Sequence, residues 1–176
     1  MSSTFTAPLR INTRQTTSND GTISADTTGA ARLSQQVSFS NVTAAGAITT
    51  YGIGALSTTA ETVVLPAGSI LENVRLFETT APSVFTGMVI TVAVNGTAVG
   101  TITPTTSQGV VNMAFSSTSG AVALASNVGT ADATISFTVG TTSGVTGTLA
   151  GVFTVDYTAR NADGSIAPYG SGYTNN

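Results

Sequence analysis

The fold is decided by residues 86–104, TGMVITVAVNGTAVGTITP, which read as two β-strands joined by a turn. The dipeptide Asn95-Gly96 lies at the centre of this stretch. A two-residue hairpin turn needs positive φ at both central positions, and Asn followed by Gly tolerates this best. Side chains alternate along both strands; on the first, one face holds Met88, Ile90, Val92 and Val94 and the other holds Val89, Thr91 and Ala93. The stretch therefore predicts one hairpin of an antiparallel sheet with a buried face.

The composition favours one β-rich domain. The chain has 176 residues, of which 41% are hydrophobic and only 7% are charged. A domain of this length buries about 70% of the surface that its unfolded chain exposes, which is enough for a hydrophobic core. Thr, Ser and Asn must supply most of the polar surface, and Thr, Val and Ile favour extended backbone. We expect very little helix.

The residue types that are absent exclude several functions. Without Cys there are no disulfides, thiolate nucleophiles or Cys-ligated zinc, and without His there is no Ser-His triad. Lys is also absent, so the cations are Arg10, Arg14, Arg32, Arg75 and Arg160, too few and too scattered to follow a phosphate backbone. The N-terminus lacks the features of a secretory signal, and no apolar run approaches the ~20 residues of a membrane span. We expect a soluble chain that is not exported by that route and binds neither nucleic acid nor membrane.

Residues 1–32 have too few apolar side chains to form a core of their own. The main apolar anchors are Phe5, Leu9 and Ile11, in a segment rich in Thr, Ser, Asn, Asp and Gly. Such a segment is either a disordered terminus or an extended arm that becomes ordered against a neighbouring subunit. In the second case the candidate interface residues are Arg10, Arg14 and Arg32. We expect the arm to be mobile in the free protein and ordered on an assembled particle.

Strands are predicted over residues 33–43, near 48–53, and on both sides of the turn at residues 66–69. Within residues 70–79, the alternation places Ile70, Val74 and Leu76 on one face, in line with two carboxylates, and Leu71, Asn73, Arg75 and Phe77 on the other. Charge on both faces is typical of a strand at a sheet edge or an interface. We expect Arg75 to form an ordinary surface ion pair with Glu72 or Glu78.

Further strands are expected over residues 110–115, 133–139 and 148–158, with a short one at 121–124. Val111, Met113 and Phe115 should face inward in the first of these. Eight or nine strands at a spacing of about ten residues are typical of an antiparallel β-sandwich or a jelly roll. The expected organisation is an extended arm at residues 1–32, a sandwich domain at 33–160, and a tail at 161–176 that begins with a turn and carries Tyr169 and Tyr173.

The candidate catalytic groups are the carboxylates Asp20, Asp26, Glu61, Glu72, Glu78, Asp132, Asp156 and Asp163. Two of them at a defined separation would suffice for a glycosidase. However, sugar clefts use aromatic platforms, and this chain has no Trp and 6% aromatic residues. Residues 161–165 have too few carboxylates for a calcium loop, and residues 140–151 lack the Lys of a phosphate loop. We expect no enzymatic activity, no metal and no cofactor.

Three segments resemble structural proteins of tailed bacteriophages. Residues 62–74, TVVLPAGSILENV, are similar to a segment of such proteins in which a strand ends in LPAG. Residues 7–14, APLRINTR, and residues 152–157, VFTVDY, are similar to segments of head decoration (cement) proteins. The resemblance implies a non-enzymatic β-rich domain, often a homotrimer, bound to the major capsid protein of a virion that assembles in the host cytoplasm.

Two alternatives to a decoration protein stay open. One is a neck or tail subunit of a tailed phage, and the other is a bacterial surface or adhesin domain. The absence of an export signal disfavours the adhesin. The copy number in purified particles distinguishes the first two, because a decoration protein approaches one copy per capsid subunit.

Overall fold

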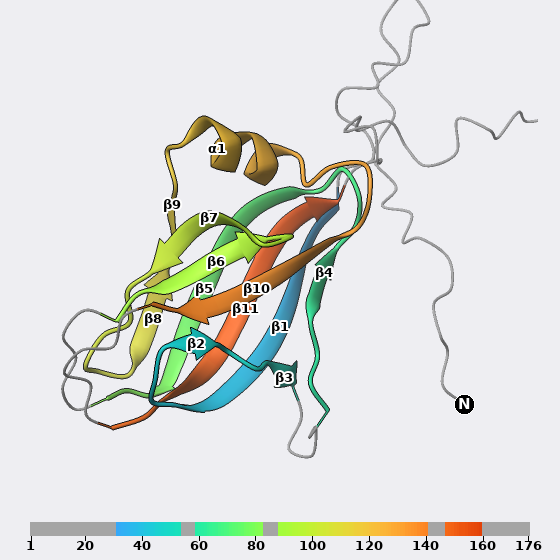
Figure 1. Ribbon diagram of the computed structural model, residues 1–176. Coiled ribbons are helices and arrows are strands. Elements are labelled where there is room, and N and C mark those ends of the chain that lie inside the picture. The colour runs from blue at the N-terminus through green and yellow to red at the C-terminus, as the bar shows by residue number, and fades with distance from the viewer. Residues whose placement is uncertain (1–30, 54–58, 83–87, 141–146, 160–176) are drawn as a thin grey trace, which may run out of the picture.

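The structure, a computed structural model, describes residues 31–53, 59–82, 88–140 and 147–159. Within these ranges, eleven strands and one helix form two antiparallel sheets that pack face to face (Figure 1). The predicted antiparallel β-sandwich is confirmed, while its finer description as a jelly roll stays a prediction. The predicted arm lies outside the described residues apart from Ala31 and Arg32, and the predicted tail lies outside them entirely.

The first sheet is built on three long strands, β1 (Ala31–Val42), β11 (Leu149–Ala159) and β5 (Ile70–Thr80). Two short strands, β3 (Tyr51–Gly52) and β8 (Gly109–Asn112), complete it in the order β3-β1-β11-β5-β8. In the register of this sheet, Val37 pairs with Phe153 and Phe153 with Leu76. These three side chains are buried, so the hydrophobic core extends across all three long strands of the sheet.

The second sheet contains the hairpin predicted from Asn95-Gly96. Its strands β6 (Ile90–Val94) and β7 (Thr97–Ile102) pair so that Val94 lies opposite Thr97, and Asn95 and Gly96 have φ of 47° and 80°. This prediction is confirmed. The sheet order is β2-β10-β6-β7-β9, and β4 also pairs with β10. The bounds of its remaining strands are β2 Gly46–Ala47, β4 Val63–Leu65, β9 Ala114–Phe115 and β10 Ala133–Val139.

An aromatic stack joins the two sheets at the centre of the core. The ring of Phe153 in β11 lies 4.6 Å from that of Phe39 in β1 and 3.9 Å from that of Phe137 in β10, measured between centroids. All three rings are buried. Stacked aromatic pairs add to the free energy of burying their area, so this stack ties one sheet to the other.

The prediction of one strand over residues 110–115 is wrong in one respect, because these residues form two strands that belong to different sheets. β8 pairs with β5 in the first sheet, and β9 pairs with β7 in the second. The chain crosses between the sheets at Met113, which is buried and whose N–H donates to Val74 O at 2.8 Å. Phe115 lies beyond this crossing and is 44% exposed, so its predicted inward position is also wrong.

The strand predicted at residues 121–124 is a helix, α1 (Ser119–Ser126). Ala121 and Ala125, one turn apart, are buried, while Val122 is 52% exposed. Alanine has the highest intrinsic helix propensity, and four apolar residues in a row do not distinguish a strand from a helical turn. The helix follows β9 and packs against β7 and β5 (Figure 1).

The expectation that residues 70–79 form an edge strand is wrong for the second half of β5. This strand pairs with β11 along its length and with β8 over residues 75–78. A register shift opposite Asp156 and Tyr157 breaks the alternation, so Leu71 is buried together with Val74 and Leu76. A bulge of this kind adds one residue to one strand. The residues before the bulge therefore point to the face opposite to the one that a regular alternation would give them.

Candidate functional site

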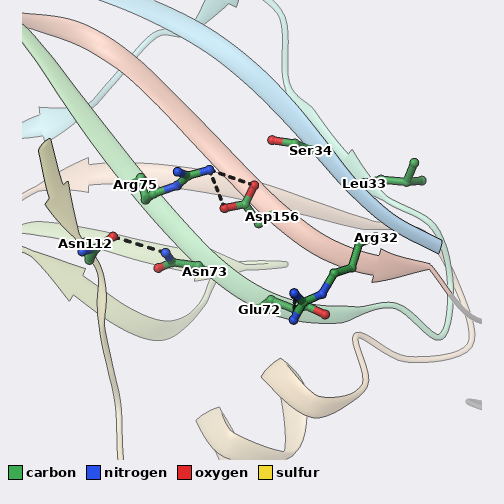
Figure 2. A pocket seen from close by; sticks show the side chains of 8 residues that line it. All are labelled: Arg32, Leu33, Ser34, Glu72, Asn73, Arg75, Asn112 and Asp156. Carbon is green, nitrogen blue, oxygen red and sulfur yellow. Dashed lines mark hydrogen bonds and ion pairs between the residues drawn. The ribbon is translucent and has the colours of Figure 1, made fainter. Parts of the chain in front are cut away.

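The outer face of the first sheet carries four of the described charged side chains, and we call it the charged face. Its polar residues surround an open hollow of about 670 Å³ (Figure 2). Cross-strand pairing places them in rows, with Asp156 opposite Asn73 and Thr154 between Gln36 and Arg75. The residues that line the hollow are Arg32, Leu33, Ser34, Glu72, Asn73, Arg75, Asn112 and Asp156.

Arg75 and Asp156 form the first ion pair of the charged face. Arg75 Nη2 lies 2.9 Å from Asp156 Oδ2 and 3.2 Å from Oδ1. The predicted pairing of Arg75 with Glu72 or Glu78 is therefore wrong. Three residues along a strand span about 10 Å, whereas neighbours across two strands lie about 5 Å apart, so the partner comes from β11.

Arg32 and Glu72 form the second ion pair, with 2.7 Å between Arg32 Nη2 and Glu72 Oε2. The hydroxyl of Thr158 also donates to the Glu72 carboxylate. Of the predicted interface residues, Arg32 thus belongs to β1 and pairs within its own subunit, whereas Arg10 and Arg14 lie outside the described residues.

Two further carboxylates hold loops. Glu78 is buried and accepts hydrogen bonds from the N–H and the hydroxyl of Thr105, both at 2.7 Å. Asp132 accepts from the N–H of Ala67 at 3.0 Å, across the turn before β5. Within the described ranges, no group of three or more His, Cys, Asp or Glu side chains lies close enough to hold a metal ion.

The outer face of the second sheet is different in character, and we call it the charge-free face. None of the strands of this sheet contains a charged residue. In one row across four strands, Thr138 lies opposite Thr91, Thr91 opposite Thr101, and Thr101 opposite Ala114. The exposed side chains of this face are Ala47, Val64, Ala98, Thr101, Ala114, Thr134, Ser136 and Thr138.

Sequence reasoning did not identify the charge-free face, although one signal for it was present. The alternation of Thr134, Ser136 and Thr138 with buried Ile135 and Phe137 predicted an uncharged outer row for β10. The other strands of the face are two to six residues long, too short to define a row by themselves. Only their pairing assembles the rows into one surface.

Comparison of the chain with protein-family models, with curated proteins and with solved structures finds no significant match. Among the described residues there is no helix with the length and apolar character needed to cross a membrane. The two outer faces are therefore the basis on which a function is proposed.

Proposed function

We propose that the protein is a non-enzymatic structural protein of a virion, namely a decoration protein that binds the outside of a phage head as a homotrimer and stabilises it. The observation that carries the proposal is the segregation of charge between the two outer faces. The capsid contact is assigned to the charge-free face. Its partner is the major capsid protein, which the resemblance of residues 62–74 to phage structural proteins suggests.

Segregation of charge suits a subunit that must bind tightly without ion pairs. The charge-free face offers Thr and Ser hydroxyls and small apolar side chains, so covering it requires no charge to be desolvated. On the charged face, each arginine already has a carboxylate partner in the same subunit. Contacts made by the charge-free face should therefore be insensitive to salt, since salt screens charges and none are present there.

The contacts of four of the five described carboxylates support a non-enzymatic role. Glu72 and Asp156 each pair with an arginine, and Glu78 and Asp132 each accept a backbone N–H. A general acid or base must be free to donate a proton to a substrate or to accept one from it. These four groups are instead engaged in contacts that hold strands and loops.

The test is to add purified protein to phage heads assembled without it and to follow co-sedimentation at low salt and at about 1 M salt, where the Debye length falls to about 3 Å. Binding should saturate near one copy per capsid subunit and persist in salt. Binding only to tails, or saturation at a few copies per particle, would instead indicate the neck or tail subunit. Release by moderate salt would overturn the assigned contact.

A matched pair of variants locates the contact. Ser136→Arg adds a charge to the charge-free face, and Ser34→Arg adds the same charge to the charged face; both serines are exposed on strands. An unpaired arginine buried in an interface is costly, so Ser136→Arg should weaken binding to heads at least about tenfold, or 1.4 kcal/mol. Ser34→Arg should bind like the wild type. Equal binding of the two variants would contradict the assignment.

A further inference from the structure

An apolar groove lies between the helix α1, the end of β9 and the start of β5, and we call it the α1 groove. Its volume is about 280 Å³, and its lining includes Ile70, Leu71, Phe115, Val122 and Ala125. Phe115 and Val122 are 44% and 52% exposed. Neighbouring apolar side chains that a subunit leaves in water mark a surface that another chain covers.

Beside the α1 groove, the strand β5 has an open edge. β11 pairs with β5 from Ile70 onward, whereas β8 pairs with it only over residues 75–78. Val74 O accepts the N–H of Met113, and no described strand continues along residues 70–73 on this side. An open edge next to an apolar groove is suited to an added strand, whose backbone pairs with the edge while alternate side chains enter the groove.

The chain contains a segment with the pattern that such a site requires. At residues 5–11, Phe5, Ala7, Leu9 and Ile11 alternate with Thr6, Pro8 and Arg10. Side chains that alternate in this way lie on one face of an extended strand, and proline is accepted in an edge strand. In residues 160–176, by contrast, Ile166, Tyr169 and Tyr173 are three and four residues apart and lie among glycines. The N-terminal segment is thus the better match.

The length of the connection allows the segment to reach the groove of a neighbouring copy. In its own subunit the groove is near, because Ala31 pairs with Ala159 and Thr158 pairs with Ile70, which places Ile70 two strand spacings, or about 10 Å, from the start of β1. The nineteen residues from 12 to 30 have an expected end-to-end distance of about 24 Å. Fully extended, these nineteen residues span about 60 Å, which exceeds the width of about 36 Å expected for a globular domain of this size.

We infer that residues 5–11 of one copy bind as an added strand in the α1 groove of a neighbouring copy. Leu9 and its alternating neighbours enter the groove, and the backbone of the segment pairs with the open edge of β5. The inference rests on the proposed homo-oligomer and explains how its subunits are linked. The proposed capsid contact uses the charge-free face and not the α1 groove. An experiment can therefore contradict one proposal and leave the other standing.

The chain has no Cys, which makes disulfide cross-linking specific. The double variant Leu9→Cys/Val122→Cys is oxidised mildly and run on a non-reducing gel. Exchange of segments between copies should give covalent dimers and trimers, whereas each single variant can give dimers at most. In the control Thr6→Cys/Val122→Cys the arm cysteine is on the opposite face of the strand, and the yield should fall at least fivefold. An internally linked monomer, or no cross-link, would overturn the inference.

A second measurement does not depend on cysteine. Val122→Arg and Leu9→Arg should each weaken the oligomer at least tenfold in analytical ultracentrifugation, while circular dichroism shows an unchanged fold. The control is Val110→Arg, since Val110 is as exposed as Val122 (55% against 52%) but lies in β8 on the first sheet. A wild type that is monomeric at high concentration, or a Val122→Arg variant that stays oligomeric, would overturn the inference. If the cross-links form but the protein does not bind heads, the proposed function is wrong and the exchange of segments stands.

Discussion

The two outer faces of the sandwich are built on the same core and yet carry opposite surface chemistry. The charged face holds two ion pairs, Arg32 with Glu72 and Arg75 with Asp156. The charge-free face holds Thr, Ser and Ala side chains together with Val64. Burial of the inner side chains does not require this difference between the outer faces. This difference is the basis on which separate roles are proposed for the two surfaces.

The charged face is already paired within the subunit, whereas the charge-free face has no charge to pair. An exposed ion pair contributes little to stability, with a typical value of about 0–1 kcal/mol. The charged face therefore contributes mainly to cross-strand order, whereas the proposed function assigns an interface to the charge-free face. The following variants test this division.

The largest effect is expected in the hydrophobic core, which lies beneath both faces. Phe153→Ala removes the middle ring of the stack between Phe39 and Phe137 and should lower the free energy of unfolding by about 4 kcal/mol. Chemical denaturation measures this loss, and hydrogen exchange should show both sheets losing protection together. Phe77→Ala, at a half-buried position on the charged face, is the control and should cost less. Protection retained in the second sheet alone would show that the faces do not share one cooperative core.

A smaller effect is expected at the end of the charge-free face. Gly96 has φ of 80°, and a Cβ added there would meet no atom within 4 Å, so only backbone conformation opposes substitution. Gly96→Val should therefore lower the free energy of unfolding by about 1–2 kcal/mol in thermal or chemical denaturation. Gly96→Asn is the control with a smaller loss, because Asn tolerates positive φ. Unchanged stability of Gly96→Val would contradict the strained turn.

The smallest effect is expected on the charged face. Asp156→Asn removes the partner of Arg75 and should cost about 1 kcal/mol at low salt, because both side chains are partly exposed. The loss should shrink near 1 M salt, where the Debye length is about 3 Å. Thr138→Val on the charge-free face is the control, and its effect should not depend on salt. Equal salt dependence of the two variants would remove the electrostatic distinction between the faces.

The strands with a regular alternation could be predicted from the sequence. In β10, the residues from Ala133 to Val139 are alternately buried and exposed as the pattern indicated. In β5 the same reasoning placed Ile70 with Val74, but the bulge opposite Asp156 buries Leu71 instead. A bulge depends on the partner strand, so the pattern of one strand cannot reveal it.

Of the candidate site, the sequence could predict the scarcity of charge but not its position. The five arginines were identified, yet the partner of Arg75 comes from a strand about eighty residues further along the chain, which pairing alone reveals. Arg32 pairs with Glu72 of its own subunit, and its expected contact with a neighbouring subunit stays a prediction. No pattern in the sequence indicated the α1 groove, because Phe115, which lines it, was expected to face inward.

By itself, the sequence determined the class of fold and the hairpin at Asn95-Gly96, because alternation and turn chemistry act between residues close in the chain. It also determined that few charges are available to any contact. Only the tertiary structure decided that the chain crosses between sheets at Met113, that residues 119–126 form a helix, and that four of the seven described charged side chains gather on one outer face. These features depend on which strands pair and in what register, and such long-range contacts are set by packing of the whole core.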